Sequence, residues 1–199
     1  LDTNTAEKTY RIYRKAPGDK KWTKIGNSKT ASFTDKKVTN GITYTYTVRT
    51  ISSTNASSYD TKGVSTMYIT TPELSKISID KNGKVNVKWK SVSGAKGYLV
   101  YKSVNGSSWK QIAKITNPKT LSYDDTSAKK SGEKYTYTVR AFSGSYKSYY
   151  VTTGISTMFL SMPKVELKNE FTEENGSCVK VSWDAITGAK TYRVYRKAS

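Results

Sequence analysis

The chain has 199 residues, of which 35% are hydrophobic and 12% aromatic, and its 34 Lys and Arg against 15 Asp and Glu give a net charge of +19. A hydrophobic fraction of this size suits small domains and excludes one large core. No apolar run approaches the roughly 20 residues that cross a bilayer. The chain has no histidine, which excludes Ser-His-Asp and Cys-His catalytic sites.

The first strongly patterned element is Tyr44–Arg49, Tyr-Thr-Tyr-Thr-Val-Arg, which recurs as Tyr135–Arg140. In both copies tyrosine and valine alternate with threonine and arginine, the period of a strand with one buried face. We therefore predict a strand in each copy, with the tyrosines and the valine facing a core. A second stretch, Ser65–Pro72, recurs at the same spacing as Ser156–Pro163, which marks the chain as repetitive.

These repeats divide the chain into three units. We expect residues 72–161 to form a complete unit, residues 1–71 to be the later part of a preceding one, and residues 162–199 to be the beginning of a following one. Pro72 and Pro163 mark the boundaries, because proline cannot donate to a central ladder and favours the ends of strands. The connectors are therefore very short, and neighbouring units are expected to lie close together.

Within the complete unit, the alternation of Val85, Val87 and Trp89 with polar residues predicts a strand with an inward face. The dipeptide Asn105-Gly106 joins two further runs and suits the positive φ angles of a tight hairpin turn. Seven short strands in about 90 residues favour a two-sheet sandwich. The predicted strands lie near residues 74–79, 84–90, 97–103, 108–115, 119–124, 133–142 and 148–160.

The fold class predicted for the whole chain is all-β, with tandem two-sheet antiparallel β-sandwiches, one complete and two truncated. In the first truncated unit Thr9–Lys15 reads as a third strand, and its near copy Thr191–Lys197 is expected to play the same part in the last unit. The first unit then lacks its two opening strands, while the last unit has those two and a third.

These residues resemble the fibronectin type III family, in the variety common in surface and secreted proteins of Gram-positive bacteria. Trp89 and Trp183 stand where that family has its second-strand core tryptophan, and Tyr98 matches its third-strand tyrosine. Tyr44 and Tyr135 follow a glycine, as the sixth-strand tyrosine of the family does. The resemblance covers nearly the whole chain, although the Leu-x-Pro that usually precedes that glycine and an Arg-Gly-Asp adhesion signal are both missing.

The resemblance implies a non-catalytic array of fibronectin type III or immunoglobulin-like modules in an extracellular or cell-surface protein. Such a segment serves as a spacer or adhesion stalk, and its partners are the neighbouring modules of the same chain. The alternative is a binding module in which lysine-rich faces and exposed aromatics hold an anionic wall polymer or a polysaccharide. The two differ in whether the basic and aromatic residues converge on one face.

Two groups of side chains could bind such a ligand. A Trp and a Tyr on one outer sheet face can stack on a sugar ring, although such pairs also pack across neighbouring strands. A second group mixes aromatic and cationic side chains in the loop and strand after the repeated hexapeptide. The candidate ligand-binding residues are Tyr101, Trp109, Tyr146, Lys147, Tyr149 and Tyr150.

Other reactive side chains give no support to an enzyme. We interpret Asp124-Asp125 and Glu173-Glu174 as solvated pairs without a catalytic role. Cys178 is the only cysteine, so it has no disulfide partner within the chain and is expected to be an inert thiol. One cysteine without histidine predicts no metal or cofactor site. No nucleic-acid-binding motif occurs, so no specific nucleic-acid partner is expected.

Overall fold

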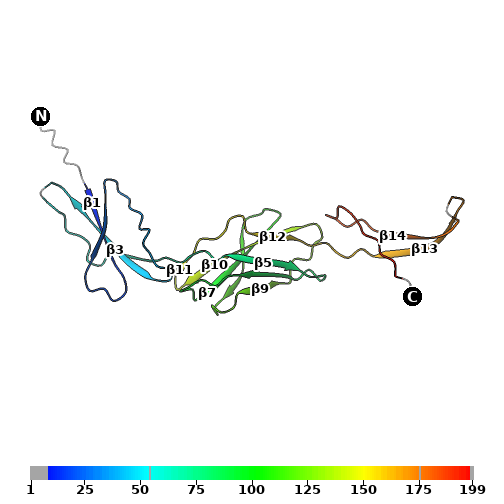
Figure 1. Ribbon diagram of the computed structural model, residues 1–199, viewed down its shortest axis with the longest axis horizontal. Helices are drawn as coiled ribbons and strands as arrows, with labels where there is room; N and C mark the ends of the chain where they lie inside the picture. Colours follow the sequence, from blue (N-terminus) through cyan, green and yellow to red (C-terminus); the bar gives the residue numbers. More distant parts are fainter. Residues whose placement is uncertain (1–8, 54, 175, 198–199) are drawn as a thin grey trace, which may run out of the picture.

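All regular elements that the computed structural model describes are β-strands, and this confirms the all-β fold class. The described residues are 9–53, 55–174 and 176–197. The remaining positions, which include the outer ends of the expected first and third units, lie outside the described residues. The sheets follow one another along the long axis of the molecule, in chain order (Figure 1).

The N-terminal sheet has four antiparallel strands in the order β2-β1-β3-β4. In its central pair, β1 and β3, Thr9 lies opposite Ile51 at one end and Lys15 lies opposite Thr45 at the other. One face of this sheet carries Ile12 and Tyr44, which are buried, while Val48 on β3 remains exposed. The strands are β1 (Thr9–Lys15), β2 (Thr23–Ser28), β3 (Thr43–Ile51) and β4 (Val64–Met67).

The central sandwich has two sheets that pack face to face. One has the order β5-β6-β9, and the other has the order β11-β10-β7-β8 with β12 also paired to β10. The strands are β5 (Leu74–Ile79), β6 (Val85–Trp89), β7 (Gly97–Val104), β8 (Lys110–Ile115), β9 (Ser122–Asp125), β10 (Lys134–Ser143), β11 (Tyr146–Lys147) and β12 (Ile155–Met158).

The core of the central sandwich is built from the side chains that alternation predicted to face inward. Buried residues from β6 meet buried residues from β7 and β10, and the ring of Trp89 lies 5.4 Å from that of Tyr98 between centroids. The inward-facing side chains predicted for β6 and β10 are therefore confirmed. The buried members from these three strands are Val85, Val87, Trp89, Tyr98, Val100, Tyr135, Tyr137, Val139 and Ala141.

The last predicted strand of this unit is shorter in the structure. A strand was expected near residues 148–160, but within that range only β12 pairs with β10, and β11 lies just before it. Gly154 closes a turn by donating its N–H to the carbonyl of Val151 at 3.1 Å and has a φ of +59°. At the hairpin turn, by contrast, Asn105 and Gly106 have φ angles of 51° and 80°, as predicted.

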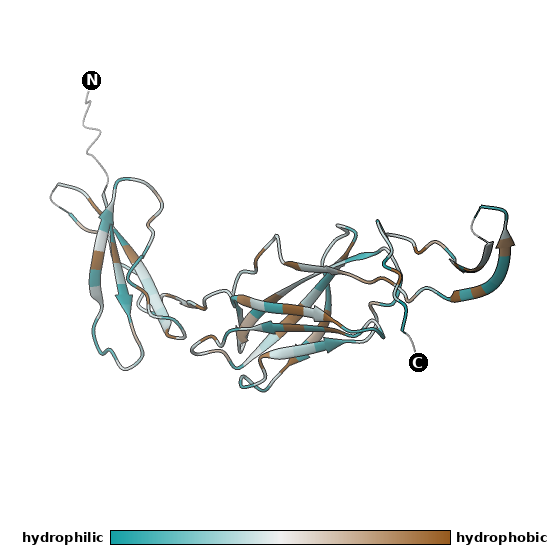
Figure 2. Ribbon diagram, turned by 45° about the vertical axis from the view of Figure 1, so that its right-hand side comes forward, coloured by the Kyte–Doolittle hydropathy of each residue, from teal (hydrophilic) through white to brown (hydrophobic). Residues whose placement is uncertain are grey.

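The C-terminal hairpin consists of β13 (Val165–Thr172) and β14 (Gly176–Trp183), and bands of hydrophobic residues alternate along it (Figure 2). Its register pairs Val165 with Trp183, as β5 and β6 pair Leu74 with Trp89. The expected third strand at residues 191–197 is wrong, because that stretch forms no ladder. In the central sandwich the same strand is stabilised by two neighbours, and among the described residues of the last unit it meets neither.

Candidate functional site

Three of the six candidate residues form one aromatic cluster on the central sandwich. The ring of Tyr150 stacks on that of Tyr101 at 6.1 Å between centroids, and the edge of the Trp109 ring meets it at 6.2 Å. The guanidinium of Arg140 lies 5.6 Å from the centroid of Tyr150, within reach of a cation–π attraction. Tyr150 is thus half-buried, in contact with three groups of its own chain.

The same cluster occurs in the N-terminal sheet. Tyr59 stacks on Tyr13 at 5.9 Å, meets the edge of Trp22 at 6.3 Å and lies 5.3 Å from the guanidinium of Arg49. Both units therefore build the arrangement from equivalent positions of the repeat. Its recurrence indicates that the cluster stabilises the repeated fold.

Each tryptophan of these clusters also packs against a glycine in the turn before the last strand of its sheet. A Cβ atom built on Gly154 would lie 3.0 Å from the ring of Trp109, and one built on Gly63 would lie 2.8 Å from the ring of Trp22. The glycines thus let the two rings approach the backbone closely. Part of each ring surface is already in contact with the protein.

The other three candidates lie at the β10–β11 end of the central sandwich, apart from the aromatic cluster. Tyr146 is half-buried and packs against the hydrophobic core. Lys147 is exposed, and Tyr149 is 87% exposed. The structure therefore divides the six candidates between a packed cluster and a pair of free side chains.

Lys147 and Tyr149 help to line a groove of about 780 Å³ between the central sandwich and the N-terminal sheet. Figure 1 shows β11 beside the end of that sheet. Most of the groove is the inward face of the N-terminal sheet, so its lining is largely apolar. The lining residues from that sheet and its connecting segments include Ile12, Phe33, Tyr44, Tyr46, Val48 and Ile69.

A buried carboxylate, which the sequence analysis placed in a solvated pair, links the two sheets of the central sandwich. Asp125 is 4% exposed and lies on β9. It accepts hydrogen bonds from the Lys102 ammonium at 2.9 Å, from the Tyr137 hydroxyl at 2.8 Å and from the backbone N–H of Ser127 at 2.8 Å. Only its neighbour Asp124 is solvent-exposed, as expected.

The N-terminal sheet carries the same network. Asp35 accepts hydrogen bonds from the Arg14 guanidinium at 2.7 Å, from the Tyr46 hydroxyl at 3.1 Å and from the Lys37 N–H at 2.9 Å. A repeated Ser-aromatic-x-Asp signature, at residues 32–35 and 122–125, marks both acidic residues in the sequence. That repeat is the signal that could have identified them.

The network shifts the pKa values of its members in opposite directions. Burial alone would raise the pKa of Asp125, but hydrogen bonds from Ser127, Lys102 and Tyr137 outweigh it and hold that pKa below its usual value. Burial and the hydrogen bond to Asp125 raise the pKa of Tyr137. In the N-terminal sheet, burial and the contact with Asp35 raise the pKa of Tyr46 to about 12.

The raised pKa of Tyr137 predicts a loss of stability in alkali. An unfolded tyrosine ionises near pH 10, whereas folded Tyr137 ionises only at higher pH. Its contribution is therefore complete below about pH 10 and declines as the pH rises toward the folded pKa. We expect Tyr137→Phe to flatten the alkaline limb of the free energy of unfolding, measured by urea titration at several pH values. Tyr149→Phe, which removes an exposed hydroxyl, is the control, and equal slopes in both variants would contradict the assignment.

The remaining reactive groups form no further site. The Cys178 side chain is half-buried on β14, and Glu173 and Glu174 are exposed at the turn of the C-terminal hairpin. Across residues 9–53, 55–174 and 176–197, no three His, Cys, Asp or Glu side chains gather in a way that could hold a metal ion. The same ranges contain no helix that could span a membrane.

The strand order of the central sandwich places its first, second and fifth strands in one sheet and the others in the second. Two antiparallel sheets connected in this way are typical of immunoglobulin-like and fibronectin type III domains. The fold is fibronectin type III-like. No protein-family model matches the sequence, and no curated protein matches it significantly.

Two solved structures illustrate the likeness. A segment of two fibronectin type III domains from chicken tenascin has a TM-score of 0.44 and 16% identity, over 76% of this chain and 83% of that one. The FN1–FN3 domains of chicken CNTN1 have a TM-score of 0.40 and 15% identity over 77% of this chain. The match spans 54% of the CNTN1 chain, about half its length. The fold assignment rests on the strand order of the central sandwich and on its repeated core residues.

Proposed function

We propose that this chain is a segment of a repeat array that acts as a spacer or adhesion stalk in a bacterial cell-surface or secreted protein. The observation that carries the proposal is the aromatic cluster that recurs in both fibronectin type III-like units. Its tyrosine rings stack on one another, and its tryptophan meets them edge-on and packs against a backbone glycine. The residues best suited to bind a sugar are therefore used to stabilise the units themselves.

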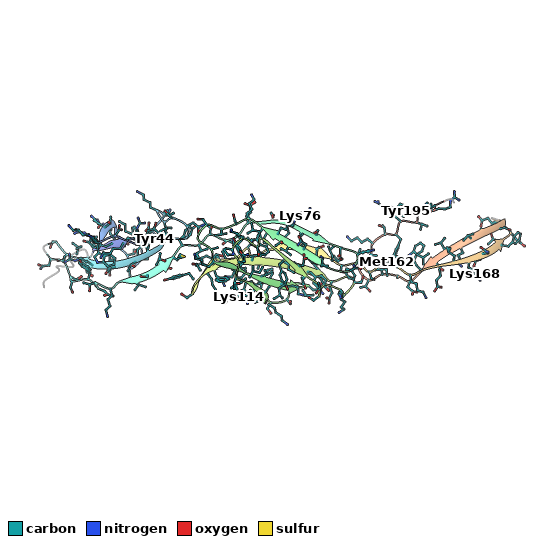
Figure 3. The ribbon with its side chains drawn as sticks, turned by 90° about the horizontal axis from the view of Figure 1, so that it is seen from below. Tyr44, Lys76, Lys114, Met162, Lys168 and Tyr195 are labelled. Carbon is teal, nitrogen blue, oxygen red and sulfur yellow. The ribbon has the colours of Figure 1, made fainter. Side chains whose placement is uncertain are left out.

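The distribution of positive charge agrees with this proposal. Lys76 on β5 and Lys114 on β8 lie on opposite sides of the central sandwich, and Lys168 lies far along the C-terminal hairpin (Figure 3). The charge is thus spread around and along the molecule. These lysines do not converge on one basic face, as a polyanion site would require.

The connectors also agree with a stalk. Only residues 68–73 separate β4 from β5, and only residues 159–164 separate β12 from β13. Pro72 is fully buried in the first connector. Connectors this short limit the motion of one unit relative to the next. A spacer needs this restriction to hold its two ends at a fixed separation.

The second candidate function is the binding of an anionic wall polymer or a polysaccharide. It is favoured by one observation, the exposed pair Lys147 and Tyr149 at the rim of the apolar groove. A cationic side chain beside a free aromatic ring offers both charge and a stacking surface. This pair occurs in the central sandwich, whereas the N-terminal sheet has Ala56 and Ser58 at the corresponding positions.

A titration with wall teichoic acid and with a neutral glycan separates the two functions. For a spacer we expect only weak teichoic acid binding that disappears at physiological salt, where exposed charges are screened beyond about 8 Å, and no glycan binding. Salt-resistant, saturable binding of either ligand would overturn the spacer proposal. If Tyr149→Ala abolishes that binding, the second candidate is supported. Tyr195→Ala, which removes another exposed ring, is the matched control.

A further inference from the structure

Two pairs of glycines meet backbone to backbone where successive units join. A Cβ atom built on Gly41 would lie 2.6 Å from the Cα of Gly94, and one built on Gly188 would lie 2.6 Å from the Cα of Gly132. Real Cβ atoms essentially never come within 3.0 Å of a heavy atom of a residue that is not adjacent in the chain. Each pair therefore allows a contact that any larger residue would prevent.

The two pairs occupy equivalent places in the repeat. Gly41 and Gly132 both precede the repeated Tyr-Thr-Tyr-Thr-Val-Arg strand, and Gly94 and Gly188 both begin a Gly-Ala-Lys sequence. The first contact joins the N-terminal sheet to the central sandwich, and the second joins the central sandwich to the C-terminal unit. The same contact thus occurs at both junctions of the chain.

The first side of each junction is fixed by repeated hydrogen bonds. Gly41 donates its N–H to the carbonyl of Tyr68 at 2.8 Å, and Gly132 donates to Phe159 at 2.9 Å. The turn that precedes each glycine is bound by a tyrosine hydroxyl, which accepts from an N–H at 3.1 Å in both units. Those tyrosines, Tyr44 and Tyr135, are buried in the cores.

The second side is fixed in a similar way. The Tyr98 hydroxyl accepts from the N–H of Val92 at 3.1 Å, and the Tyr192 hydroxyl accepts from the N–H of Ile186 at 2.6 Å. Each of these N–H groups lies two residues before the glycine of its pair. A tyrosine hydroxyl therefore anchors both sides of each junction.

At the second junction a direct hydrogen bond adds to the contact. The Ser131 hydroxyl donates to the carbonyl of Thr187 at 3.1 Å, and it also accepts from the N–H of Ser161 at 3.1 Å. In the first junction Asn40 holds the place of Ser131 and accepts from the N–H of Thr70 at 2.9 Å. The residue before the first glycine thus orders the connector at both junctions.

We infer that the glycine pairs form a repeated joint, a docking surface on each unit whose partner is the next unit of the same chain. Because both sides are anchored by tyrosine hydroxyls, three of them on buried residues, the joint sets one orientation between neighbours, and its repetition makes the array a stiff rod. This inference deepens the proposed spacer function and rests on it. The joint is a property of the contact between two units and not of either unit alone.

The joint is tested by distances between spin labels on the full chain. For the first joint, Cys178→Ser is combined with labels at Lys62→Cys and Lys76→Cys, both exposed positions. For the second, labels at Lys76→Cys and the native Cys178 are used. We expect one narrow distance distribution across each joint in the otherwise unchanged chain. A broad distribution in that chain would overturn the inference.

Alanine substitutions supply the matched comparison. Gly41→Ala and Gly18→Ala both strain a backbone with positive φ, +79° and +90°, but a Cβ on Gly18 meets nothing within 4 Å. We expect Gly41→Ala to shift or broaden the first-joint distribution and Gly18→Ala to leave it unchanged. Gly132→Ala should affect the second joint alone. Equal distributions for Gly41→Ala and Gly18→Ala would overturn the joint.

Two further measurements separate the joint from unfolding and from the spacer function. Retained β-sheet circular dichroism in the Gly41→Ala and Gly132→Ala variants shows that a changed distance reflects the joint and not unfolding. The teichoic acid and glycan titrations report on the spacer function independently. Ligand binding with narrow distances would overturn the spacer and support the joint, whereas broad distances without ligand binding would overturn the joint and leave a flexible spacer.

Discussion

Replacing Asp125 by alanine is expected to lower the free energy of unfolding of the central sandwich by about 3–5 kcal/mol, the usual cost of removing one partner from a buried ion pair. The substitution leaves the Lys102 ammonium, whose side chain is 14% exposed, without its counterion. It also leaves the hydroxyl of Tyr137, a fully buried residue, without its acceptor. Both groups then pay a desolvation cost that no hydrogen bond offsets.

The adjacent residue provides a control of the same chemistry. Asp124 bonds to Lys84 at 3.2 Å and to Asn86 at 2.6 Å, and the side chains of Asp124 and Lys84 are both about half exposed. Exposed pairs of this kind contribute about 0–1 kcal/mol, so Asp124→Ala should be nearly neutral. Urea unfolding of the full chain, with hydrogen exchange of the β10 amides, measures both variants. Similar costs for the two would refute the role given to Asp125.

The hydrophobic phase of the strands could be predicted from the sequence because it depends on local alternation. Val85, Val87 and Trp89 follow one another at a spacing of two, and a strand with that spacing has only one way to bury them. The repeated hexapeptide carries the same information for β3 and β10. For β6 and β10 the sequence was sufficient to predict both the element and its buried face, whereas on β3 the strand forms but Val48, which was expected to face a core, is 47% exposed.

Features that depend on distant partners could not be predicted in the same way. Asp125 was assigned to a solvated pair because the residues that bury it, Lys102 and Tyr137, come from other strands. The stretch 191–197 has the residues of a strand but no sheet beside it among the described residues, and it forms no ladder. The aromatic cluster likewise needed the fold to show that Tyr150 packs against Tyr101 and Trp109.

The same dependence on a partner leads to the second expected result, self-association of the chain. In the central sandwich, β5, β6 and β9 cover the inward face of β7 and β10. In the N-terminal sheet no described strand covers the equivalent face, which forms the groove of about 780 Å³. Phe33 and Val48, which line it, are 40% and 47% exposed.

The C-terminal hairpin has the complementary surface. It pairs Leu167 with Val181 as β5 and β6 pair Ile77 with Val87, and its inward side chains are exposed. A second copy can therefore place its hairpin over the open face as β5 and β6 lie over theirs. The segment 32–35 is equivalent to β9 but forms no ladder here. In the central sandwich β9 pairs with β6. The β14 strand of the incoming hairpin would pair with segment 32–35 in the same way.

We expect the chain to associate head to tail as its concentration rises, because strand addition buries both apolar faces at once. The N-terminal sheet and the hairpin lie at opposite ends of the long axis (Figure 1), so one molecule cannot readily close on itself. Light scattering across a concentration series measures the average mass. Val181→Lys places a charge on the inward face and should keep the chain monomeric, whereas Ser182→Lys places the same charge on the other face and should not. A chain that stays monomeric at high concentration, or that associates equally well with either lysine, would show that the hairpin does not fill the groove.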